Sequence, residues 1–318
     1  MTQSMFSREI SSEGRFLRQG NRFTHRVTAD GSSGFPVEPG RYHLIASPAC
    51  PWSHRVIITR RLLGLEDAIG LSVVDPVWGE DGWVFATPDG RDPATGLTGV
   101  AEAYRANDPR HGGRSTLPLL YDAKSERIVS NDFRRIPLDL ATEWTEFHAA
   151  DAPQLYPREL RAEVDSLSEL IYNDLADGVY RCGLATTEDA YQDAYEQLFS
   201  RLDWLQMVAS VRRYLLEPDR ITDVDIQLFV VLVRFDAVYH DLFRCDRQRL
   251  TDFPLLWAYA RDLFQLPHFG DTVDFAEIQR HYHHTYQWLS STGTVPAEPD
   301  RADWLTAHGR EDMPQMPQ

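Results

Sequence analysis

The sequence predicts a protein of two domains, a mixed α/β domain followed by an all-α domain. Short apolar runs typical of strands occur between about residues 41 and 132, around one strongly helical segment. Beyond about Pro157 apolar residues recur only at helical spacing, and no strand alternation persists. The length of 318 residues is enough for about two domains with a sizeable core.

The first elements of the α/β domain can be placed in order along the chain. Residues 1–40 are rich in Ser, Gly and Arg and show little periodicity, so we expect an irregular N-terminal extension. The stretch RYHLIAS then alternates as a strand does. The segment from Trp52 to Leu63 has helical character, with Pro51 where a helix start favours proline. Gly64 is typical of a helix end.

The stretch LSVVDPV predicts a second strand, which gives a β-α-β unit with Cys50 at its first turn. Residues 78–113 form a long, loop-rich insertion, and insertions of this kind often cover or bind ligands. STLPLLYD and ERIVSND then predict a hairpin, followed by a helix from about Asp132. The order β-α-β, insertion, β-β-α predicts a thioredoxin-like domain over residues 41–150.

Four segments of the second half carry apolar residues at helical spacing. They are DSLSELIYNDL, EDAYQDAYEQLFSRLDWLQMVA, DVDIQLFVVLVRFDAVY and PLLWAYARDLFQ. They predict an all-helical domain over residues 157–291, and the residues rich in Pro, Asp and Glu at 292–318 predict an irregular tail. Thr222 and Asp225 have the spacing of a capping box, so we expect them to nucleate the central helix of this domain.

The formal net charge of −16 indicates a strongly acidic surface. Such a surface repels phosphate backbones and anionic lipids, so we expect neither nucleic-acid nor membrane partners. The sequence shows no run of about eighteen apolar residues that could span a bilayer. The N-terminus also lacks the apolar stretch of a signal peptide. We therefore expect a cytoplasmic protein.

The cysteines are Cys50, Cys182 and Cys245, and their odd number and wide spacing match neither a disulfide framework nor a zinc site. We therefore expect reduced thiols. Cys50 lies immediately before the predicted helix, where backbone N–H groups and the helix dipole stabilise a thiolate. His54 and Arg55 add positive charge one turn further on if their side chains face the thiol.

Two further features favour a catalytic role for Cys50 over that of an inert core cysteine. Ser53 takes the position of the second cysteine of a C-x-x-C pair, so a mixed disulfide on Cys50 must be cleared by an outside thiol. The sequence Thr116-Leu117-Pro118 precedes the next strand, where thioredoxin-like folds place a cis proline. A cis X–Pro bond at this point leaves the preceding backbone groups free to pair with a peptide-like ligand.

Nine motifs follow one another along most of the chain. They are CPWSHR, DPVWGEDGW, GGRSTLPLLYD, RIVSND, DGVYRCGLATTEDAY, LVRFDAVYHDLFRCD, ARDLFQLPHFGDTVDF, IQRHYHHTY and STGTVPAEP. Their series, from about Tyr42 to about Pro299, resembles the successive signatures of the Xi-class glutathione transferases, the glutathionyl-hydroquinone reductases. The resemblance implies a thioredoxin-like domain joined to an all-helical glutathione-transferase domain, usually as a homodimer.

The resemblance also implies roles for individual residues. Cys50 is then the catalytic thiolate, with no bound cofactor and with glutathione or another low-molecular-weight thiol as cosubstrate. Tyr180 and Tyr282 match tyrosines near the aromatic substrate, where they hydrogen-bond a phenolic oxygen or supply a proton. Residues of the thioredoxin-like domain line or face the implied thiol pocket: Trp83, Arg114, Leu117, Pro118, Val129, Ser130 and Asp132.

Several of these residues also have an ordinary structural interpretation. Trp83 could be a packed aromatic of the insertion, and Tyr180 and Tyr282 could be hydrogen-bonded core tyrosines. Three histidines of the motif RHYHH do not suggest a metal site, because neighbouring positions on a helix do not converge on one ion. They are His281, His283 and His284.

One departure from the family pattern concerns the thiol. After the hairpin the pattern is roughly S-N-E-S, in which the acid and the last serine bind the γ-glutamyl end of glutathione, whereas this chain has SNDF at residues 130–133. Asp132 keeps a carboxylate, but Phe133 cannot hydrogen-bond a carboxylate as serine does. The loss costs roughly 1–3 kcal/mol, or about tenfold to a hundredfold in affinity, unless Arg134 or Arg135 replaces the contact. A different thiol, such as mycothiol, therefore stays open.

The predicted function is that of a cysteine-dependent thiol transferase or reductase that releases hydroquinones from glutathionyl or other thiol conjugates through a Cys50 mixed disulfide. One alternative is a general thiol–disulfide oxidoreductase of the glutaredoxin type, or a conjugating transferase. An alternative of another class is a non-catalytic ligand-binding or scaffold protein, and Phe133 is its best support.

Overall fold

The computed structural model describes residues 6–290, 293–311 and 313, and the chain divides into two compact units. The first unit is Gln19–Ala152, and the second consists of Thr2–Arg18 together with Pro153–Gln318. The N-terminal segment is thus shared between the units, because the residues up to Arg18 belong to the second unit and the following ones to the first.

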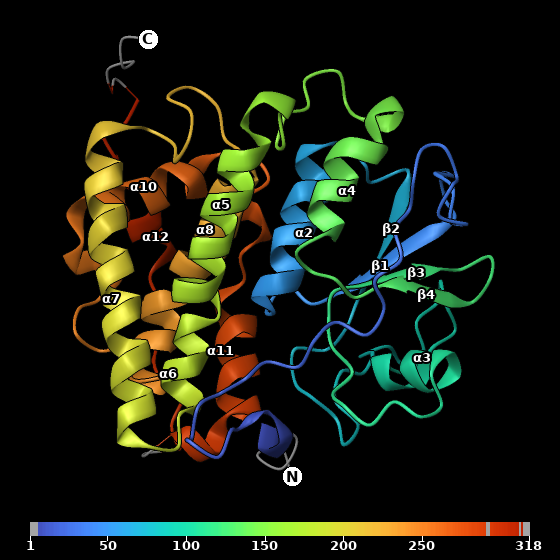
Figure 1. The fold of residues 1–318 in the computed structure, drawn as a ribbon, viewed down its shortest axis with the longest axis horizontal. Helices are drawn as coiled ribbons and strands as arrows, with labels where there is room; N and C mark the ends of the chain where they lie inside the picture. Colours follow the sequence, from blue (N-terminus) through green and yellow to red (C-terminus); the bar gives the residue numbers. More distant parts are fainter. Residues whose placement is uncertain (1–5, 291–292, 312, 314–318) are drawn as a thin grey trace. The chain divides into compact units, whose positions relative to one another are not determined.

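The first unit is built around a four-stranded sheet with the strand order β2-β1-β3-β4. β1 pairs with β2 in parallel, while β3 pairs antiparallel with both β1 and β4. Helices α2 and α4 lie side by side on one side of the sheet, and α3 lies on the other (Figure 1). The elements are β1 (Tyr42–Ala46), α2 (Pro51–Leu62), β2 (Ile69–Val73), α3 (Val100–Asn107), β3 (Leu119–Asp122), β4 (Arg127–Ser130), α4 (Ile136–Glu143) and the short η2 (Thr145–Phe147). This is the thioredoxin-like fold that the sequence predicts.

The register of the sheet brings three loops to one end of it. Ile45, near the end of β1, pairs with Leu119 at the start of β3. Leu120 in turn pairs with Ser130 at the end of β4. Because β3 runs opposite to β1 and β4, the segments after β1, before β3 and after β4 all leave the sheet at this end. The predicted nucleophile, the predicted cis proline and the SNDF turn therefore all lie at one end of the sheet.

The insertion at residues 78–113 contains a helix, α3, that the loop-rich composition did not predict. It has only 8 residues, too few for a clear helical period in the sequence. Val100 and Tyr104 are buried on its inner face. Thr98 donates its backbone N–H and its hydroxyl to the Glu102 carboxylate over 2.7 and 2.8 Å, which fixes the start of the helix.

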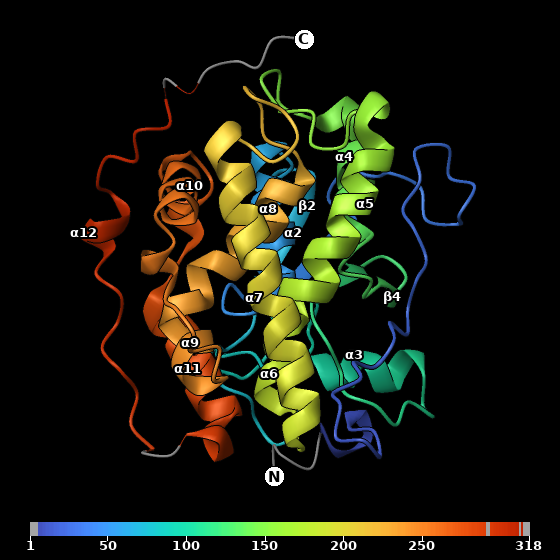
Figure 2. The same cartoon turned by 60° about the vertical axis from the view of Figure 1, so that its left-hand side comes forward.

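The second unit is all-helical in the part of the chain that the structure describes, as the sequence predicts. Figure 2 shows its long helix α7 in front, beside α6. Its elements are η1 (Ser7–Glu9), η3 (Arg158–Leu160), α5 (Arg161–Ile171), η4 (Tyr172–Ala176), α6 (Gly178–Leu184), α7 (Glu188–Val211), α8 (Asp223–Arg234), η5 (Phe235–Tyr239), α9 (His240–Leu242), η6 (Leu250–Asp252), α10 (Pro254–Gln265), η7 (Gly270–Thr272), α11 (Phe275–Thr285), η8 (Gln287–Leu289) and α12 (Arg301–Trp304).

Helix α8 is the core of the second unit, because every one of its residues is buried. The predicted capping box at its start is confirmed: the Thr222 backbone N–H donates to the Asp225 carboxylate over 2.8 Å. A fully buried helix start must satisfy its backbone donors internally, since water does not reach them. The capping box does this.

The C-terminal tail, predicted to be irregular over residues 292–318, contains the short helix α12. In its described part, Trp304 is buried and packs edge-on against Trp257 of α10 with ring centroids 4.7 Å apart. Its ring also lies 5.0 Å from that of Phe264. Two aromatic contacts with α10 hold this segment, whereas its Pro-rich and acidic composition gave no sign of order.

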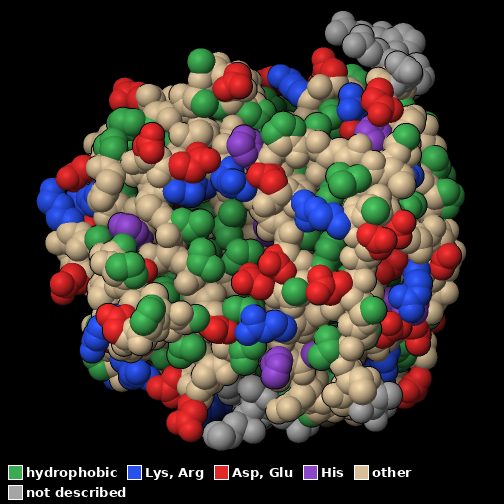
Figure 3. Space-filling view, turned by 180° about the vertical axis from the view of Figure 1, so that it is seen from behind, with side chains coloured by type: hydrophobic (Ala, Val, Ile, Leu, Met, Phe, Trp, Pro, Cys, Tyr) green, Lys and Arg blue, Asp and Glu red, His purple; other side chains and the backbone are tan. Residues whose placement is uncertain are grey.

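The surface shown in Figure 3 carries acidic and basic side chains interspersed, so the negative net charge is not gathered into one patch on that face. Within the described residues, the structure contains no helix long and apolar enough to cross a membrane.

Candidate active site

Cys50 occupies the N-cap position of α2, with Pro51 as the first helical residue. The Cys50 backbone N–H donates to the Ser47 carbonyl over 3.1 Å, and the Cys50 carbonyl accepts the first helical hydrogen bond from His54 over 2.9 Å. The side chain is 6% exposed, and none of the three cysteines forms a disulfide. The thiol therefore lies at the end of the helix whose dipole favours negative charge.

The residues around Cys50 are closely packed. Ser53 and His54 are fully buried, and Arg55 nearly so. The hydroxyls of Ser47 and Ser53 are buried and have no hydrogen-bond partner among the described residues. Because a buried hydroxyl without a partner is costly, both are candidate partners for a bound thiol substrate. The sequence gave Ser53 only as the replacement of a resolving cysteine, and it gave no signal for Ser47.

The peptide bond between Leu117 and Pro118 is cis, as the sequence predicts. The preceding Thr116 anchors this loop, since its hydroxyl accepts a hydrogen bond from the Asn131 amide over 2.9 Å and lies 3.1 Å from the Tyr104 hydroxyl. Burial raises the pKa of Tyr104 to about 12, so this phenol stays protonated near neutral pH. These hydrogen bonds join the cis-proline loop to the turn after β4. They hold the two segments of the candidate thiol site together.

The turn at residues 130–133 is held by its own side chains. The Ser130 hydroxyl accepts the Asp132 backbone N–H over 3.0 Å. The Asp132 carboxylate accepts the N–H groups of Arg134 and Arg135 over 3.1 and 3.2 Å. The carboxylate that the sequence assigned to a ligand amine therefore also caps the backbone before α4.

Phe133 packs on Trp52 of α2, with ring centroids 4.5 Å apart, and is only 8% exposed. The position at which the family pattern has serine therefore presents an aromatic ring beside the first turn of α2. Arg135 is already engaged, because its Nε donates to Asp139 over 2.8 Å. Phe133, which replaces the serine of the family pattern, is thus part of the packing of the first unit.

Trp83, Arg114 and Val129 all belong to the first unit. Trp83 is buried and packs edge-on against Trp78, with ring centroids 5.5 Å apart. The Gln19 side chain clamps the backbone of Arg114, accepting its N–H over 2.8 Å and donating to its carbonyl over 2.7 Å. Val129 is a fully buried residue of β4. A role of these three residues in thiol binding stays a prediction.

Tyr180 and Tyr282 belong to the second unit and form one cluster with Tyr239, which the sequence did not single out. The Tyr282 hydroxyl lies 2.6 Å from that of Tyr180 and 2.9 Å from that of Tyr239. All three side chains are buried, and burial raises the pKa of Tyr282 well above its usual value. The hydrogen-bonded hydroxyls can donate or relay protons, and burial keeps the Tyr282 phenol neutral.

Two π-helical turns shape this tyrosine cluster. η5 follows α8 and ends at Tyr239, and η4 precedes α6, the helix of Tyr180. A π turn inserts one extra residue into a helix, and such turns are frequent at functional sites. An extra residue at η5 changes the helical period of the residues that follow α8 up to Tyr239. The sequence analysis did not single out Tyr239.

Phe243 and Gly183 complete the surroundings of the cluster. The Phe243 ring lies 5.3 Å from that of Tyr180 and 5.7 Å from that of Tyr282. Gly183 of α6 lies so close to Phe243 that a Cβ added at this glycine would be 2.5 Å from the Phe243 ring. The absence of a side chain at Gly183 thus lets α6 approach the ring that supports the tyrosines.

We expect Gly183→Ala to lower the free energy of unfolding by about 1–3 kcal/mol, because the new methyl group overpacks against Phe243. The usual effect of this exchange inside a helix is a gain of up to about 1 kcal/mol. Gly178→Ala in the same helix is the matched control, since its nearest atoms lie 3.7 Å from an added Cβ. Urea unfolding of both variants measures the difference. A Gly183→Ala protein as stable as the Gly178→Ala protein would contradict the packing argument.

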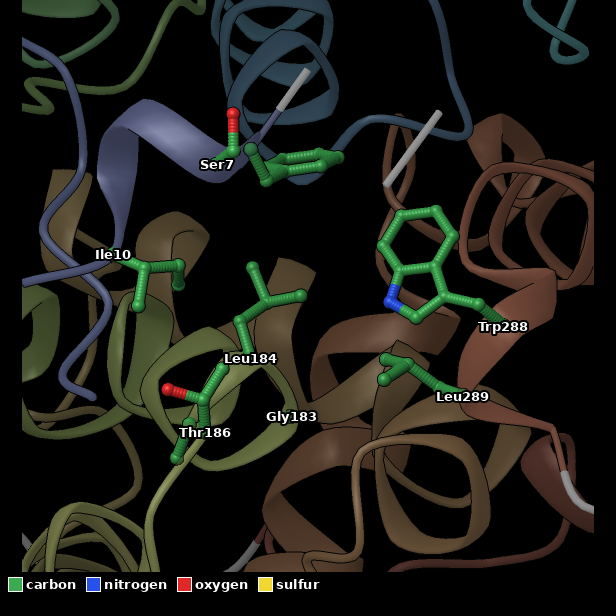
Figure 4. A pocket seen from close by; sticks show the side chains of 9 residues that line it. Ser7, Ile10, Gly183, Leu184, Thr186, Trp288 and Leu289 are labelled. Atoms are coloured by element: carbon green, nitrogen blue, oxygen red, sulfur yellow. The ribbon is translucent and has the colours of Figure 1, made fainter. Parts of the chain in front are cut away.

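A largely apolar pocket of about 670 Å³ lies in the second unit near this cluster (Figure 4). Ile10, Leu184 and Trp288 point toward it from three different segments. Tyr286 connects the pocket to the tyrosines, because its ring lies 5.6 Å from that of Trp288 and stacks on Tyr282 at 5.8 Å. The second unit therefore offers an apolar cavity bordered by aromatic rings that lead to the phenols.

Both units match known sequence families. The family model of the glutathione S-transferase N-terminal domain matches residues 49–143, and that of the C-terminal domain matches residues 188–262. The chain is 39% identical over 291 residues to the glutathionyl-hydroquinone reductase PcpF of Sphingobium chlorophenolicum, which covers 91% of each protein. It is 38% identical over 312 residues to the glutathionyl-hydroquinone reductase YqjG of Escherichia coli K12, with coverage of 95% and 94%.

Solved structures agree with these matches. A glutathione transferase from Gordonia bronchialis superposes with a TM-score of 0.89 at 47% identity, covering 93% of this chain and 92% of that one. The glutathione transferase Xi of Phanerochaete chrysosporium gives a TM-score of 0.86 at 36% identity, with coverage of 92% and 95%. The glutathione-bound structure of YqjG gives 0.85 at 37% identity, with coverage of 91% and 96%. The chain therefore belongs to the glutathione S-transferase family, among the Xi-class enzymes that include the glutathionyl-hydroquinone reductases.

Proposed function

We propose that this enzyme releases hydroquinones from thiol conjugates with Cys50 as its nucleophile. The observation that carries the proposal is the position of Cys50 at the N-terminus of α2, at the same end of the sheet as the cis-proline loop. The names of the relatives, glutathionyl-hydroquinone reductases, support the substrate class. In this proposal the enzyme works as a homodimer, as the resemblance of the sequence implies.

The proposed reaction has two steps. The Cys50 thiolate first attacks the sulfur of the thioether conjugate, so that a sulfur–sulfur bond forms while the carbon–sulfur bond breaks. The ring carbon takes the electron pair and a proton and leaves as the free hydroquinone. A second thiol, as its thiolate, then attacks the mixed disulfide, releases Cys50 and departs as a disulfide. Ser53 in place of a resolving cysteine fits this use of an outside thiol.

In this scheme Tyr180 or Tyr282 supplies the proton to the leaving ring. The hydrogen bonds of Tyr282 to Tyr180 and Tyr239 support the assignment. A phenol that gives up its proton becomes a phenolate, and hydrogen bonds to a charged oxygen are stronger than those between neutral groups. The hydrogen bonds of the cluster thus offer a path for the proton, although burial and the neighbouring phenols raise the pKa of Tyr282 and Arg234 acts in the opposite direction.

Glutathione is the thiol that the relatives support, because YqjG has been solved with glutathione bound. The packing of Phe133 on Trp52 argues for a second candidate. An aromatic ring at this position suits a thiol whose far end does not carry the γ-glutamyl carboxylate. Mycothiol meets that condition, so we keep it as the alternative cosubstrate.

We expect Phe133→Ser to tighten glutathione binding by about tenfold to a hundredfold, because the hydroxyl restores a hydrogen-bond partner for the ligand carboxylate. Calorimetric titration of wild type and variant with glutathione measures the change. Intact-mass analysis after separate incubation with glutathione disulfide and mycothiol disulfide identifies the thiol that Cys50 accepts. An unchanged dissociation constant in the variant would contradict the role assigned to residue 133.

Substrate choice separates the proposed reductase from its rivals. We expect turnover of an aromatic thioether with consumption of one thiol for each hydroquinone released. Faster turnover of a plain mixed disulfide would favour a glutaredoxin-type enzyme, and consumption of free thiol with a quinone would favour a conjugating transferase. A protein that forms no Cys50 adduct with any of these disulfides would be a ligand-binding protein.

A further inference from the structure

Arg18, the last N-terminal residue of the second unit, lies against the tyrosine cluster. Its guanidinium carbon is 4.6 Å from the centroid of the Tyr180 ring and 5.2 Å from that of Phe16. Its Nε donates to the Asp177 carboxylate over 2.5 Å, and the side chain is 12% exposed. A cation is thus held on the face of a tyrosine whose hydroxyl lies 2.6 Å from that of Tyr282.

The surroundings keep this guanidinium charged. Burial opposes the charge and is the largest single influence, but Asp177 and the phenols of Tyr172 and Tyr180 outweigh it, so the pKa of Arg18 is raised. Asp177 is shared between two arginines, because the Arg181 Nε lies 4.0 Å from its other oxygen.

Other polar groups face the tyrosines from the remaining elements of the second unit. Arg234 of α8 acts on Tyr282 in the direction opposite to burial, favouring its phenolate. Tyr239 of η5 hydrogen-bonds Tyr282. The His281 ring packs edge-on against that of Tyr282 at 5.1 Å, and the Tyr286 ring lies 6.4 Å from that of Tyr180. Arg18 differs from all of these, because it places a full charge on the ring face of Tyr180.

We propose that Arg18 is a positioning residue of the reaction, which stabilises the negative charge that develops on Tyr180 while the tyrosine cluster delivers its proton. A cation on a ring face is attracted by the electrons of the ring, and the attraction grows when a phenol becomes a phenolate. The contact is therefore stronger in the transition state than in the resting enzyme, which is the condition for an effect on turnover. The inference rests on the proposed function. It gives the N-terminal segment that ends at Arg18 a role in proton delivery.

The test compares Arg18→Met with Arg15→Met. Arg15 belongs to the same N-terminal segment of the second unit and pairs with Asp193 over 2.5 Å, but its side chain is 46% exposed. We expect Arg18→Met to lower kcat by about tenfold to thirtyfold with little change in KM. The alkaline limb of its pH profile moves to higher pH, because Tyr180 then loses its proton less readily. Arg18→Lys is expected to restore part of kcat. Arg15→Met is expected to leave kcat and the alkaline limb of the pH profile as in wild type.

A double-mutant cycle with Tyr180→Phe shows whether Arg18 acts through this phenol. In the Tyr180→Phe background, Arg18→Met is expected to change kcat less than twofold. An equal loss of kcat in both backgrounds, an unmoved alkaline limb, or equal losses in Arg18→Met and Arg15→Met would overturn the inference. These outcomes are distinct from failure of the proposed function, in which wild type itself would not turn over the aromatic thioether.

Discussion

Replacement of Cys50 by serine is expected to abolish the release of hydroquinone from a thiol conjugate, with turnover reduced at least about a thousandfold. A serine hydroxyl is not ionised near neutral pH, so it cannot attack the conjugate sulfur as a thiolate does. The fold is expected to survive, because serine is among the residues most favoured at an N-cap, the position that Cys50 occupies in α2. Steady-state turnover and urea unfolding of the variant measure the two effects separately.

The buried cysteines supply the control for this experiment. Cys245 is fully buried, and burial raises the pKa of its thiol, so it is a poor nucleophile. Cys245→Ala is therefore expected to keep both the turnover and the thiol adduct seen by intact-mass measurement. Full turnover in Cys50→Ser would rule out the proposed covalent mechanism, whatever the behaviour of the control.

The sequence predicted most of the candidate thiol site of the first unit, because its determinants are local. A strand, then Cys50-Pro51, then a helix predicts that Cys50 lies at a helix start, and the structure has this arrangement. The cis bond before Pro118 also follows from one short motif. The partners that hold this loop were not predictable in the same way. Tyr104 lies in a helix that was not recognised, and its contact with Thr116 depends on tertiary packing.

The tyrosine cluster of the second unit was predicted only in part. Tyr180 and Tyr282 came from the resemblance to a family, since a buried tyrosine has no local sequence signal for catalysis. Tyr239 was missed because its contact with Tyr282, 43 positions away in the chain, depends on tertiary packing. Arg18 was missed because its partner Asp177 lies 159 positions away in the chain. Contacts between residues so far apart follow from the packing of the second unit and leave no periodic pattern in the sequence.

Phe133, which stands where the family pattern has serine, has a structural role that the sequence did not predict. The sequence identified the loss of a serine hydroxyl, which by itself suggests a weakened site. The structure adds that the ring packs on Trp52, the second residue after Cys50. Phe133 is thus part of the packing beside Cys50, and the consequence of this packing for glutathione binding stays a prediction.

Replacement of Asp225 by alanine is expected to lower the free energy of unfolding by about 3–5 kcal/mol. Asp225 is fully buried at the start of α8. One carboxylate oxygen accepts the Leu215 N–H over 2.9 Å and the Tyr259 hydroxyl over 2.7 Å, and the other accepts the N–H and the hydroxyl of Thr222 over 2.8 and 3.1 Å. Alanine leaves these buried donors without an acceptor. Each such loss costs about 1–3 kcal/mol, and the losses overlap.

Asp274→Ala is the matched control for this substitution. Asp274 also caps a helix of the second unit, α11, and accepts the Glu277 N–H over 2.9 Å, but it is exposed. Water replaces the lost acceptor there, so the expected cost is only about 1 kcal/mol. Urea unfolding followed by circular dichroism compares the two variants. Equal losses would show that burial adds nothing to the cap of α8.

The free energy of unfolding is also expected to depend on pH through the titration of Asp225. Burial is the largest influence on Asp225 and raises its pKa above the ordinary value of 3.8, although its hydrogen bonds act in the opposite direction. The folded state therefore holds this proton to higher pH than the unfolded state does. The titration of Asp225 thus lowers stability as the pH rises from about 3.8 through the raised pKa. Asp225→Asn lacks this titration, so the stability of wild type relative to this variant is expected to decline across that window. A relative stability that stays constant or increases with pH would show that the hydrogen bonds outweigh burial at Asp225.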